Sequence, residues 1–499
     1  FFHFDIHPPF YDKNYWNYHT FLTIVAYATV AQTTIIALEK SLSTDFLNII
    51  CFSFFSNSII KLRISKKGAN AVVFYEIAVI GGGASGMVAA IAAAEQSRIM
   101  GLSTNITVYE KQERVGKKLL ATGNGCCNLA NSSLELSNYH GKDTAFAKTA
   151  LSLYNLPHTL DFFQKLGLLT KEEENGKIYP YSRQAAAVLD VLRFRTEALG
   201  IKTACGYAVK HLKPQNNGFL LTAESGLQTL QFFAHKVVLA TGGLAAPKLG
   251  GSAQAYELAL QLGHTNTPLF PALVQIKTEN TFTKPLKGIK ANAKASVWQN
   301  NALLAEHHGE ILFTEYGVSG PPIFDLSRLI SEHYTQNRKP VLTLALDLMP
   351  EYREETLTEM LNARKSLLQF LSLENFLTGM QNKRLGQTVL KAAKILPLSR
   401  PAASLSQTET QRLAHFLKCF ALPITGTLPW ANAQVTAGGI NTEHFDPGTM
   451  ESKLVKGFYA CGEVLDIDGN CGGYNLQWAW SSGLLAGVSA VKGLSTEVK

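Results

Sequence analysis

The fold class is decided by one stretch of the chain, Ile77-Ala78-Val79-Ile80-Gly81-Gly82-Gly83-Ala84-Ser85-Gly86. It begins as an apolar strand, passes through glycines and continues into an alanine-rich helical stretch, which is the setting of a dinucleotide-binding turn. In such a turn Gly81 permits the tight bend, Gly83 lets the backbone approach a pyrophosphate, and Gly86 lets the helix pack close to the strand. The helix N-terminus would then present free N–H groups to phosphates. The stretch predicts a nucleotide-binding α/β domain.

Glu110 supports this interpretation, because it ends a second apolar strand, residues 106–110, and follows Gly86 by 24 positions. A carboxylate at this place can accept hydrogen bonds from both hydroxyls of a ribose. A glycine turn in an ordinary α/β domain remains the alternative explanation of the pattern.

Composition limits the classes of function. The 499 residues carry a formal net charge of +8, but only 17% are charged, and the basic residues are scattered. This pattern indicates an anionic cofactor rather than nucleic acid, and we expect no nucleic-acid partner. The seven cysteines include no C-x-x-C pair, and no cluster has the spacing of metal ligands. We therefore expect a reducing, cytoplasmic compartment and no metal site.

The first 70 residues differ from the rest of the chain. They hold nine of the 27 Phe but only one of the 39 Gly, and the chain does not begin with Met. Residues 21–38 are mostly apolar and approach the ~20 residues of a membrane helix, although several Thr weaken the match. Our interpretation is a translation start placed too far upstream; a membrane anchor and an ordered extension are the alternatives.

From residue 74 the pattern becomes α/β, and it changes twice more along the chain. We expect strands at 76–80, 106–110 and 236–240, a helix from Ser182 as N-cap to Gly200, and an antiparallel meander that begins at 202–205. Short alternating strands follow after 271, helical patterns cover 354–371, 376–395 and 409–417, and the glycine-rich α/β pattern returns near 433. The expected segments are 1–72, an atypical extension; 73–270 and 433–499, one discontinuous nucleotide-binding domain; 271–349 with 418–432, a β-rich insert; and 350–417, a helical insertion.

Two further glycine-rich segments indicate which dinucleotide binds. Residues 116–131 follow the ribose acid and suit a loop wrapped around a long cofactor, with Lys117 or Lys118 near a phosphate. Residues 457–479 place Glu463 after a strand and begin a helix near Tyr474, whose dipole would stabilise an anionic reduced flavin. Because NAD alone would not need the second segment, the pair favours FAD.

Several motifs then make the chain resemble the BaiN-like, aminoacetone-oxidase-type family, also called the YhiN family, of FAD-binding flavoproteins. The family belongs to the glutathione-reductase-like superfamily with two dinucleotide folds. The motifs are the Gly81–Gly86 turn, Thr122-Gly123-Asn124-Gly125, Ala240-Thr241-Gly242-Gly243, Gly317-Val318-Ser319-Gly320-Pro321, Val435-Thr436-Ala437-Gly438-Gly439 and Gly472-Gly473-Tyr474-Asn475-Leu476-Gln477. The resemblance implies a Rossmann-like FAD domain interrupted by a β-barrel-like domain that carries a helical subdomain. The chain departs from the family pattern at several positions: Cys126 replaces an Arg, Ala130 replaces a Thr, Ala253-Gln254-Ala255 replace Thr-Gly-Asp-Gly before Tyr256, and Glu315 replaces a His.

The segments and the resemblance together predict which residues contact the cofactor. These are Gly81, Gly83, Ala84, Ser85, Gly86, Glu110, Lys111, Lys118, Thr122, Gly123, Asn124, Asn128, Val209, Ala240, Thr241, Gly242, Gly462, Glu463, Gly473, Tyr474, Asn475 and Leu476. The catalytic residues stay open, with Glu315 and Tyr474 as weak candidates. Adjacent Cys126 and Cys127 invite a thiol-redox role, but close packing beside the cofactor is favoured because adjacent cysteines bridge only with strain.

The expected activity is that of an FAD-dependent oxidoreductase acting on a small organic molecule. The resemblance implies either reduction of a conjugated C=C bond or oxidation of an amine. No second nucleotide fingerprint occurs, so NAD(P)H is expected at most as a transient electron donor. A non-catalytic FAD-binding redox sensor and a membrane-associated dehydrogenase that reduces quinone are the other hypotheses.

Overall fold

The computed structural model describes residues 49–54, 58–63, 74–336 and 340–495, in two units, Phe1–Val73 and Phe74–Lys499. In the first unit, β1 (Ile49–Phe54) pairs antiparallel with β2 (Ser58–Arg63). The apolar stretch at 21–38 lies outside the described residues. Within the described part of the chain, no helix has the length and apolarity required to cross a bilayer.

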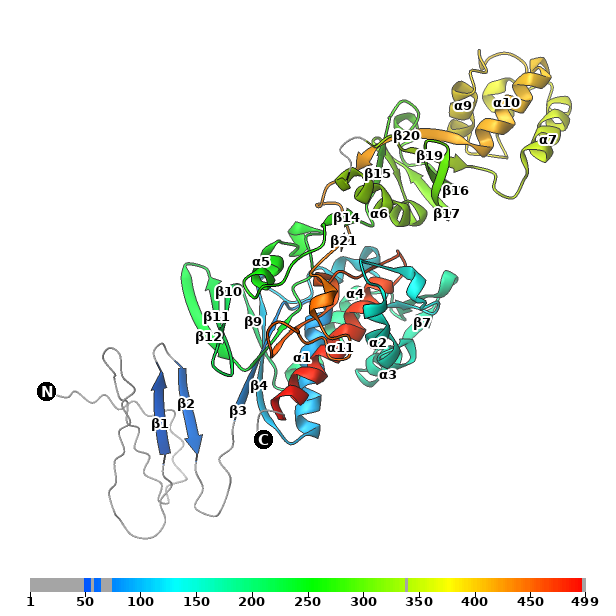
Figure 1. Cartoon of the computed structure of the whole chain (residues 1–499). Helices are drawn as coiled ribbons and strands as arrows, with labels where there is room; N and C mark the ends of the chain where they lie inside the picture. Colours follow the sequence, from blue (N-terminus) through cyan, green and yellow to red (C-terminus); the bar gives the residue numbers. More distant parts are fainter. Residues whose placement is uncertain (1–48, 55–57, 64–73, 337–339, 496–499) are drawn as a thin grey trace, which may run out of the picture. The chain divides into compact units, whose positions relative to one another are not determined.

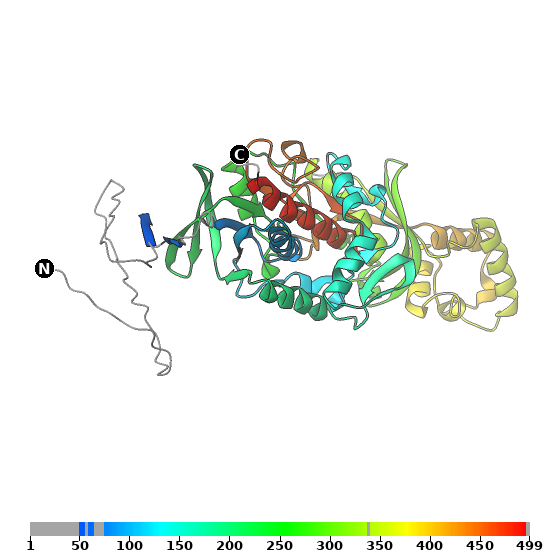
Figure 2. The same ribbon diagram turned by 90° about the horizontal axis from the view of Figure 1, so that it is seen from below.

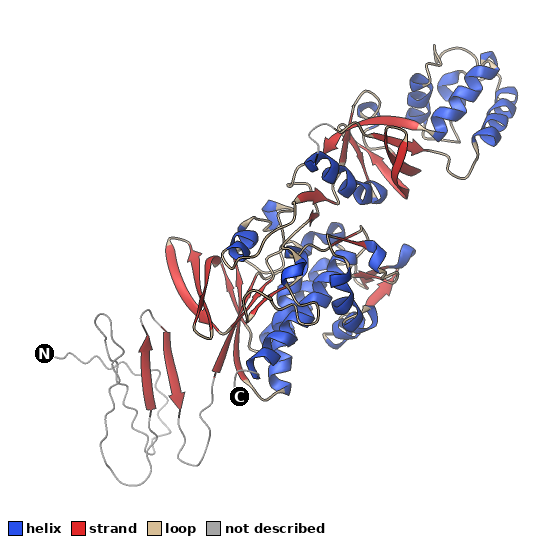
Figure 3. Ribbon diagram, in the orientation of Figure 1, coloured by secondary structure: helices blue, strands red, loops and turns tan. Residues whose placement is uncertain are grey.

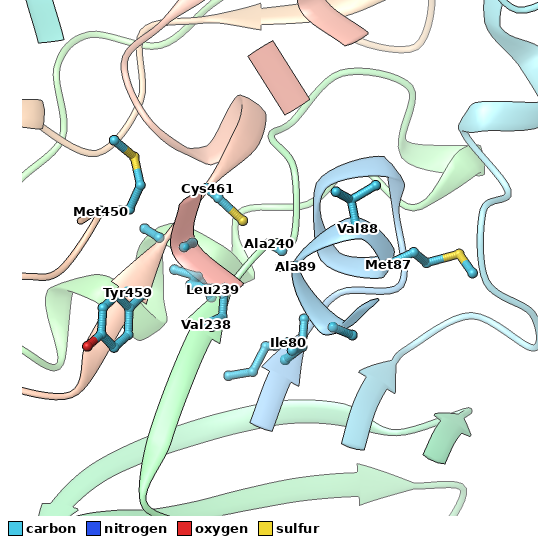
Figure 4. Packing of buried hydrophobic residues seen from close by; sticks show 14 of the residues in the cluster. Ile80, Met87, Val88, Ala89, Val238, Leu239, Ala240, Met450, Tyr459 and Cys461 are labelled. Atoms are coloured by element: carbon cyan, nitrogen blue, oxygen red, sulfur yellow. The ribbon is translucent and has the colours of Figure 1, made fainter. Parts of the chain in front are cut away.

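A five-stranded parallel sheet forms the centre of the second unit (Figures 1 and 3). Its order is β22 (Phe458–Ala460), β13 (Lys236–Leu239), β3 (Phe74–Ile80), β4 (Ser103–Glu110) and β9 (Lys202–Cys205). The inner strands are apolar on both faces because both faces are covered. Figure 4 shows how Ile80, Val238 and Leu239 of these strands pack against Val88 and Ala89 of the adjoining helix.

Helices α1 (Ala84–Ile99) and α11 (Tyr474–Ser495) lie side by side on this sheet in both views (Figures 1 and 2). Small residues permit the close approach: a Cβ on Gly483 would lie 2.6 Å from the Ser85 carbonyl oxygen, and a Cβ on Gly487 would overlap that of Ala89. Beside them lie α2 (Ala145–Leu153), α3 (Leu156–Lys165) and α4 (Ala185–Ala198). The first and last helices of the described residues therefore belong to one layer.

A second, antiparallel sheet packs against the parallel one, and two details differ from expectation. The sheet consists of β10 (Ala208–Gln215), β11 (Gly218–Ser225) and β12 (Gln228–Ala234). The expected meander strand at 202–205 is instead β9, which pairs parallel with β4 because α4 carries the chain across in a right-handed βαβ connection. The expected N-cap Ser182 was wrong: α4 begins at Ala185, and Gln184 precedes it without a side-chain cap.

The insert is a closed six-stranded barrel. Around it run β15 (Ile276–Thr278), β18 (Gly317–Ser319), β17 (Ala302–Phe313), β16 (Lys290–Gln299), β19 (Thr343–Asp347) and β20 (Phe420–Thr427), with α6 (Pro321–Gln336) packed against several of them. Between β19 and β20 the chain forms the helical part, α7 (Glu354–Leu367), α8 (Leu373–Phe376), α9 (Lys383–Ala392) and α10 (Gln407–Lys418). Of the helix expected at 376–395, only α9 forms; α8 already ends at Phe376, and a turn separates the two helices. The predicted fold class, a Rossmann-like domain interrupted by a barrel with a helical part, is confirmed.

Short elements connect these parts. The strands β14 (Phe270–Ala272) and β21 (Val435–Ala437) pair where the chain leaves and re-enters the Rossmann-like domain, next to α5 (Gln254–Leu260). Near the start of α11, β5 (Ala130–Asn131), β8 (Lys177–Pro180) and β7 (Thr170–Glu172) form a small antiparallel sheet, while β6 (Tyr139–His140) pairs with β23 (Asp468–Gly469). Segments far apart in the sequence thus meet around one edge of the parallel sheet.

The contact between α1 and α11 leads to a stability prediction. Replacing Gly487 by Ala normally favours a helix by about 1 kcal/mol. Here the added methyl overlaps the Ala89 carbonyl, so we expect the free energy of unfolding to fall by about 1–3 kcal/mol. Urea denaturation of the full chain followed by tryptophan fluorescence measures the change. Equal or greater stability of the variant would show that the two helices are farther apart than described.

Candidate cofactor and substrate site

One cavity of about 1060 Å³ lies beyond the carboxyl ends of β3, β4 and β13. This is the edge at which parallel α/β sheets bind ligands, because the crossover connections leave a crevice there. Typical sites for a drug-sized ligand measure about 300–1,000 Å³, so the cavity has room for a dinucleotide and part of a second molecule. Its lining comes from the glycine turn, the 116–128 loop, the meander, the residues before α11, and the barrel.

The glycine turn has the geometry that a pyrophosphate requires. Gly81 has a φ of +107°, and its N–H donates to the Tyr109 carbonyl oxygen at 2.8 Å. A Cβ on Gly83 would meet no atom within 4 Å, so the backbone faces open space there. Gly83 is also the N-cap of α1 and provides no side-chain cap, and the first turn holds no acidic residue. The helix therefore directs N–H groups and a partial positive charge into the cavity.

Glu110 lies beside this turn at the end of β4. One carboxylate oxygen accepts from the Gly82 N–H at 2.8 Å, and the other accepts from the Gln112 N–H at 2.7 Å. Each carboxylate oxygen can accept more than one hydrogen bond, so both remain able to receive a hydroxyl donor. Glu110 thus holds the turn in place and presents a ribose acceptor from a fixed position.

The 116–128 loop is tied to the C-terminal segment by an ion pair. The Lys118 Nζ lies 2.7 Å from a carboxylate oxygen of Glu463, whose other oxygen accepts from the Thr436 N–H at 3.0 Å. The loop itself turns sharply, since Gly123 and Asn124 have φ angles of +56° and +53°. These contacts bring the second and third glycine-rich segments, residues 116–131 and 457–479, to one wall of the cavity.

Several buried polar atoms of this wall have no hydrogen-bond partner in the protein. They are the Asn128 Oδ1, the Thr241 Oγ1 and the Gln275 Oε1, and all three residues line the cavity. A buried polar atom without a partner costs about 1–3 kcal/mol, so native proteins supply a partner from a ligand or water. Together with the open backbone at Gly83, these atoms fit a long cofactor with many polar groups, as FAD is.

The start of α11 forms the opposite end of the site. Gly472 and Gly473 have φ angles of +137° and +103°, and a Cβ on Gly473 would overlap the Ala130 carbonyl, so the chain can enter the helix only with glycine there. The Asn475 side chain holds the preceding turn through the Gly469 N–H at 2.9 Å and the Gly469 carbonyl at 2.7 Å. The helix N-terminus therefore stands at the cavity and can stabilise negative charge on a bound ring.

The cavity brings together most of the residues that the sequence predicts as cofactor contacts. Those that line it are Gly81, Gly83, Ala84, Ser85, Glu110, Lys111, Lys118, Thr122, Gly123, Asn124, Asn128, Val209, Ala240, Thr241, Gly242, Glu463, Gly473, Asn475 and Leu476. Gly86 and Gly462 do not line it and serve packing instead: a Cβ on Gly86 would overlap the Gly81 carbonyl, and one on Gly462 would lie 2.5 Å from the Ser85 Oγ.

Neither of the weak catalytic candidates reaches the cavity. Glu315 lies on an exposed turn and pairs with Lys287 at 2.8 Å, with 58% of its side chain exposed, so its placement at the flavin was wrong. Tyr474 is buried, and its ring packs edge-on against Tyr139 at 6.0 Å. Its role is to pack the first turn of α11.

Burial keeps three cysteines near the site protonated at neutral pH. Burial raises the pKa of Cys127, Cys461 and Cys471 to about 12 in each case. Because the thiolate is the reactive form, these groups are poor nucleophiles at neutral pH. Cys126 and Cys127 are both free thiols, which agrees with the expectation that they pack beside the cofactor rather than form a bond.

The residues that form the far wall of the cavity were not predicted from the sequence. Lys177 and Tyr179 of β8, together with Arg183, line it from one side, and Leu312, Pro321 and Phe324 line it from the barrel. The alternation Lys177-Ile178-Tyr179-Pro180 after the Asn175-Gly176 turn was a usable signal, because residues two apart share one face of a strand. Nothing in the sequence indicated that this face points to the cofactor.

A family model described as the HI0933-like protein Rossmann domain matches residues 75–489 of the chain. The chain belongs to the HI0933-like family. Like other members, it is an FAD-dependent oxidoreductase, which confirms the predicted enzyme class and the predicted cofactor. The family resemblance recognised from the motifs is confirmed as well.

Three relatives share most of their length with this member of the HI0933-like family. A 3-dehydro-bile acid Δ4,6-reductase of Clostridium scindens is 39% identical over 83% of this chain and 99% of its own length. A ribosomal RNA dihydrouridine synthase of Escherichia coli is 29% identical over 82% and 96%. The Haemophilus influenzae protein of the same name is 27% identical over 83% and 98%.

The position of Glu110 leads to a binding prediction. Glu110→Ala removes a charge-assisted acceptor, so we expect FAD binding to weaken by about 1.5–3 kcal/mol, or roughly 10- to 150-fold in Kd. Flavin fluorescence during titration of the apoprotein measures the Kd. Glu113→Ala is the matched control, because Glu113 is exposed and does not line the cavity. Equal affinities of the two variants would remove Glu110 from the ribose site.

Proposed function

We propose that the enzyme reduces a conjugated C=C bond of a small organic substrate, with NAD(P)H as a transient electron donor. The observation that carries the proposal is the continuity of the cavity from the dinucleotide turn to the barrel wall. A substrate at that wall would lie against the end of the cofactor next to α11. Each relative's name also describes reduction or a reduced product: a bile acid Δ4,6-reductase and two dihydrouridine synthases.

The chain's residues would position both molecules. When bound, FAD supplies the hydride for one carbon of the double bond. Asn128, Thr241 and Gln275 would hold its polar groups, Glu110 its ribose, and the α1 N-terminus its phosphates. The N-terminus of α11 would stabilise negative charge on the ring.

The barrel would supply the apolar side of the substrate site. Leu312, Pro321 and Phe324 present hydrocarbon surface, which excludes water from the reacting bond. Asp325, next to Phe324, accepts from the Cys471 N–H at 2.6 Å and so holds the segment before α11 against the barrel. Burial raises the pKa of Asp325 to about 6, so the strength of this contact should change within the neutral range.

Two further parts of the proposal concern the cellular compartment and the class of substrate. We place the enzyme in the cytoplasm, supported by its free cysteines. A small molecule is the proposed substrate class, supported by the enclosed apolar wall. The second candidate is reduction of a uracil base in RNA, supported only by the names of the two more distant relatives.

Anaerobic titration of the full-length, FAD-loaded protein with NADPH and with NADH tests the proposal. We expect one of the two donors to bleach the visible absorbance of the oxidised flavin. The absorbance should return when cyclohexenone is added in the absence of oxygen. Bleaching by amines alone would establish the oxidase alternative. A flavin that no donor bleaches would contradict the proposal and favour the sensor. Return of the colour with an RNA fragment but not with enones would favour the second candidate.

A further inference from the structure

Tyr179 and Arg183 form a part of the cavity wall that holds no part of FAD in the function proposed above. Both residues line the cavity, and both lie next to the 116–128 loop. The Tyr179 ring would lie 3.7 Å from a Cβ on Gly123. Strand β8, which carries Tyr179, pairs with β5 at Ala130, and the carbonyl of Ala130 packs against Gly473 just before α11. The pair therefore stands at the α11 end of the site, where the reacting end of the cofactor is placed above.

Arg183 is oriented by two kinds of contact. Its Nη1 donates to both carboxylate oxygens of Glu173, at 2.7 and 2.5 Å. Its guanidinium lies over the Tyr179 ring, 4.7 Å from the ring centre. These contacts orient the guanidinium, which stays positively charged at neutral pH.

The backbone of Arg183 shows the same constraint. Its φ is +52°, a left-handed conformation that non-glycine residues adopt at a cost of about 1–3 kcal/mol and that clusters at functional sites. Glycine would adopt this backbone conformation at a lower free-energy cost. Arg183 therefore occupies a strained backbone position beside the cavity.

We propose that Arg183, with the Tyr179 hydroxyl, binds the carbonyl oxygen conjugated to the substrate's double bond and stabilises the oxyanion that forms there. This inference rests on the proposed reduction for the identity of that oxygen. It narrows the substrates to α,β-unsaturated carbonyl compounds. Glu173 acts as a positioning residue, because its carboxylate pairs with the guanidinium and Glu173 itself does not line the cavity.

The proposed reduction conserves atoms and electrons. Hydride forms a new C–H bond at the β-carbon, the C=C π bond breaks, and its electrons move so that the carbonyl oxygen becomes an enolate oxygen. Arg183 faces this negative oxygen, and the Tyr179 O–H donates to it; burial raises the pKa of Tyr179 above its usual range, so the phenol keeps its proton. The α-carbon then takes a proton from solvent. The two electrons come from the reduced cofactor, which the nicotinamide donor restores.

Oxyanion binding can be tested on the oxidised enzyme without any turnover. A phenolate resembles the enolate and gives a long-wavelength charge-transfer band when it stacks on oxidised flavin. Titration with para-chlorophenol over a range of pH should show the wild type binding the phenolate, with a lowered apparent pKa for the bound phenol. In Arg183→Gln the apparent pKa should rise by roughly 1 unit or more, while Arg183→Lys, which keeps the charge, should restore most of the effect.

The matched control is Arg193→Gln. The Arg193 side chain is 51% exposed against 52% for Arg183, and it also pairs with a carboxylate, Asp190, but it lies on α4 and does not line the cavity. We expect this variant to behave as the wild type. Equal phenolate titrations of Arg183→Gln and Arg193→Gln, or a wild type that holds FAD but shows no phenolate band, would overturn the inference.

Transient kinetics separates this inference from the proposed function. Reoxidation of photoreduced Arg183→Gln by cyclohexenone should slow roughly 10- to 100-fold relative to Arg193→Gln, whereas reduction by the nicotinamide and the Kd for FAD should not change. An unchanged reoxidation rate would contradict the inference and leave the proposed reduction standing. A wild type that never reduces enones yet binds phenolate through Arg183 would overturn the proposed function and keep the anion site.

Discussion

The rest of the structure depends on how closely the backbone approaches itself at the glycine turn. Side chains at Gly81 and Gly86 would overlap the carbonyls of Ala240 and Gly81, so β3, α1 and the end of β13 can meet only without them. This contact places the α1 N-terminus beside the carboxyl ends of the parallel strands. The cavity and its phosphate-binding character follow from that placement.

A long insertion separates the two halves of the site, and specific contacts rejoin them. The Lys118–Glu463 ion pair spans 345 residues of sequence, and α11 packs on α1 through glycines at 483 and 487. Because β14 and β21 pair at the crossing point, the barrel can leave and re-enter the Rossmann-like domain without disturbing its sheet. The insertion then contributes the apolar wall of the cavity.

The two ends of the cavity differ in the chemistry of the groups that line them. The dinucleotide end offers backbone N–H groups, buried polar atoms without partners and a carboxylate already held by two N–H groups. The other end combines an apolar barrel surface with the guanidinium of Arg183. A flavin between them would have polar contacts along its length and a reacting face towards a site that can hold both a hydrocarbon skeleton and a polar oxygen. This arrangement supports the proposed reduction of a conjugated carbonyl compound.

The Rossmann-like class, the acid at 110 and the cofactor could be predicted from the sequence, because the backbone geometry of the turn admits only glycine and small residues in a set order. Most of the predicted contact residues line the cavity, but many other lining residues were not predicted. The change in periodicity also indicated the barrel and the helical insertion. The three-dimensional pairing of segments was needed to show that β9 joins the parallel sheet, that Glu315 lies at the surface and that Arg183 faces the cavity. Those outcomes depend on pairings between distant segments, such as β8 with β5, which no local pattern of residues specifies.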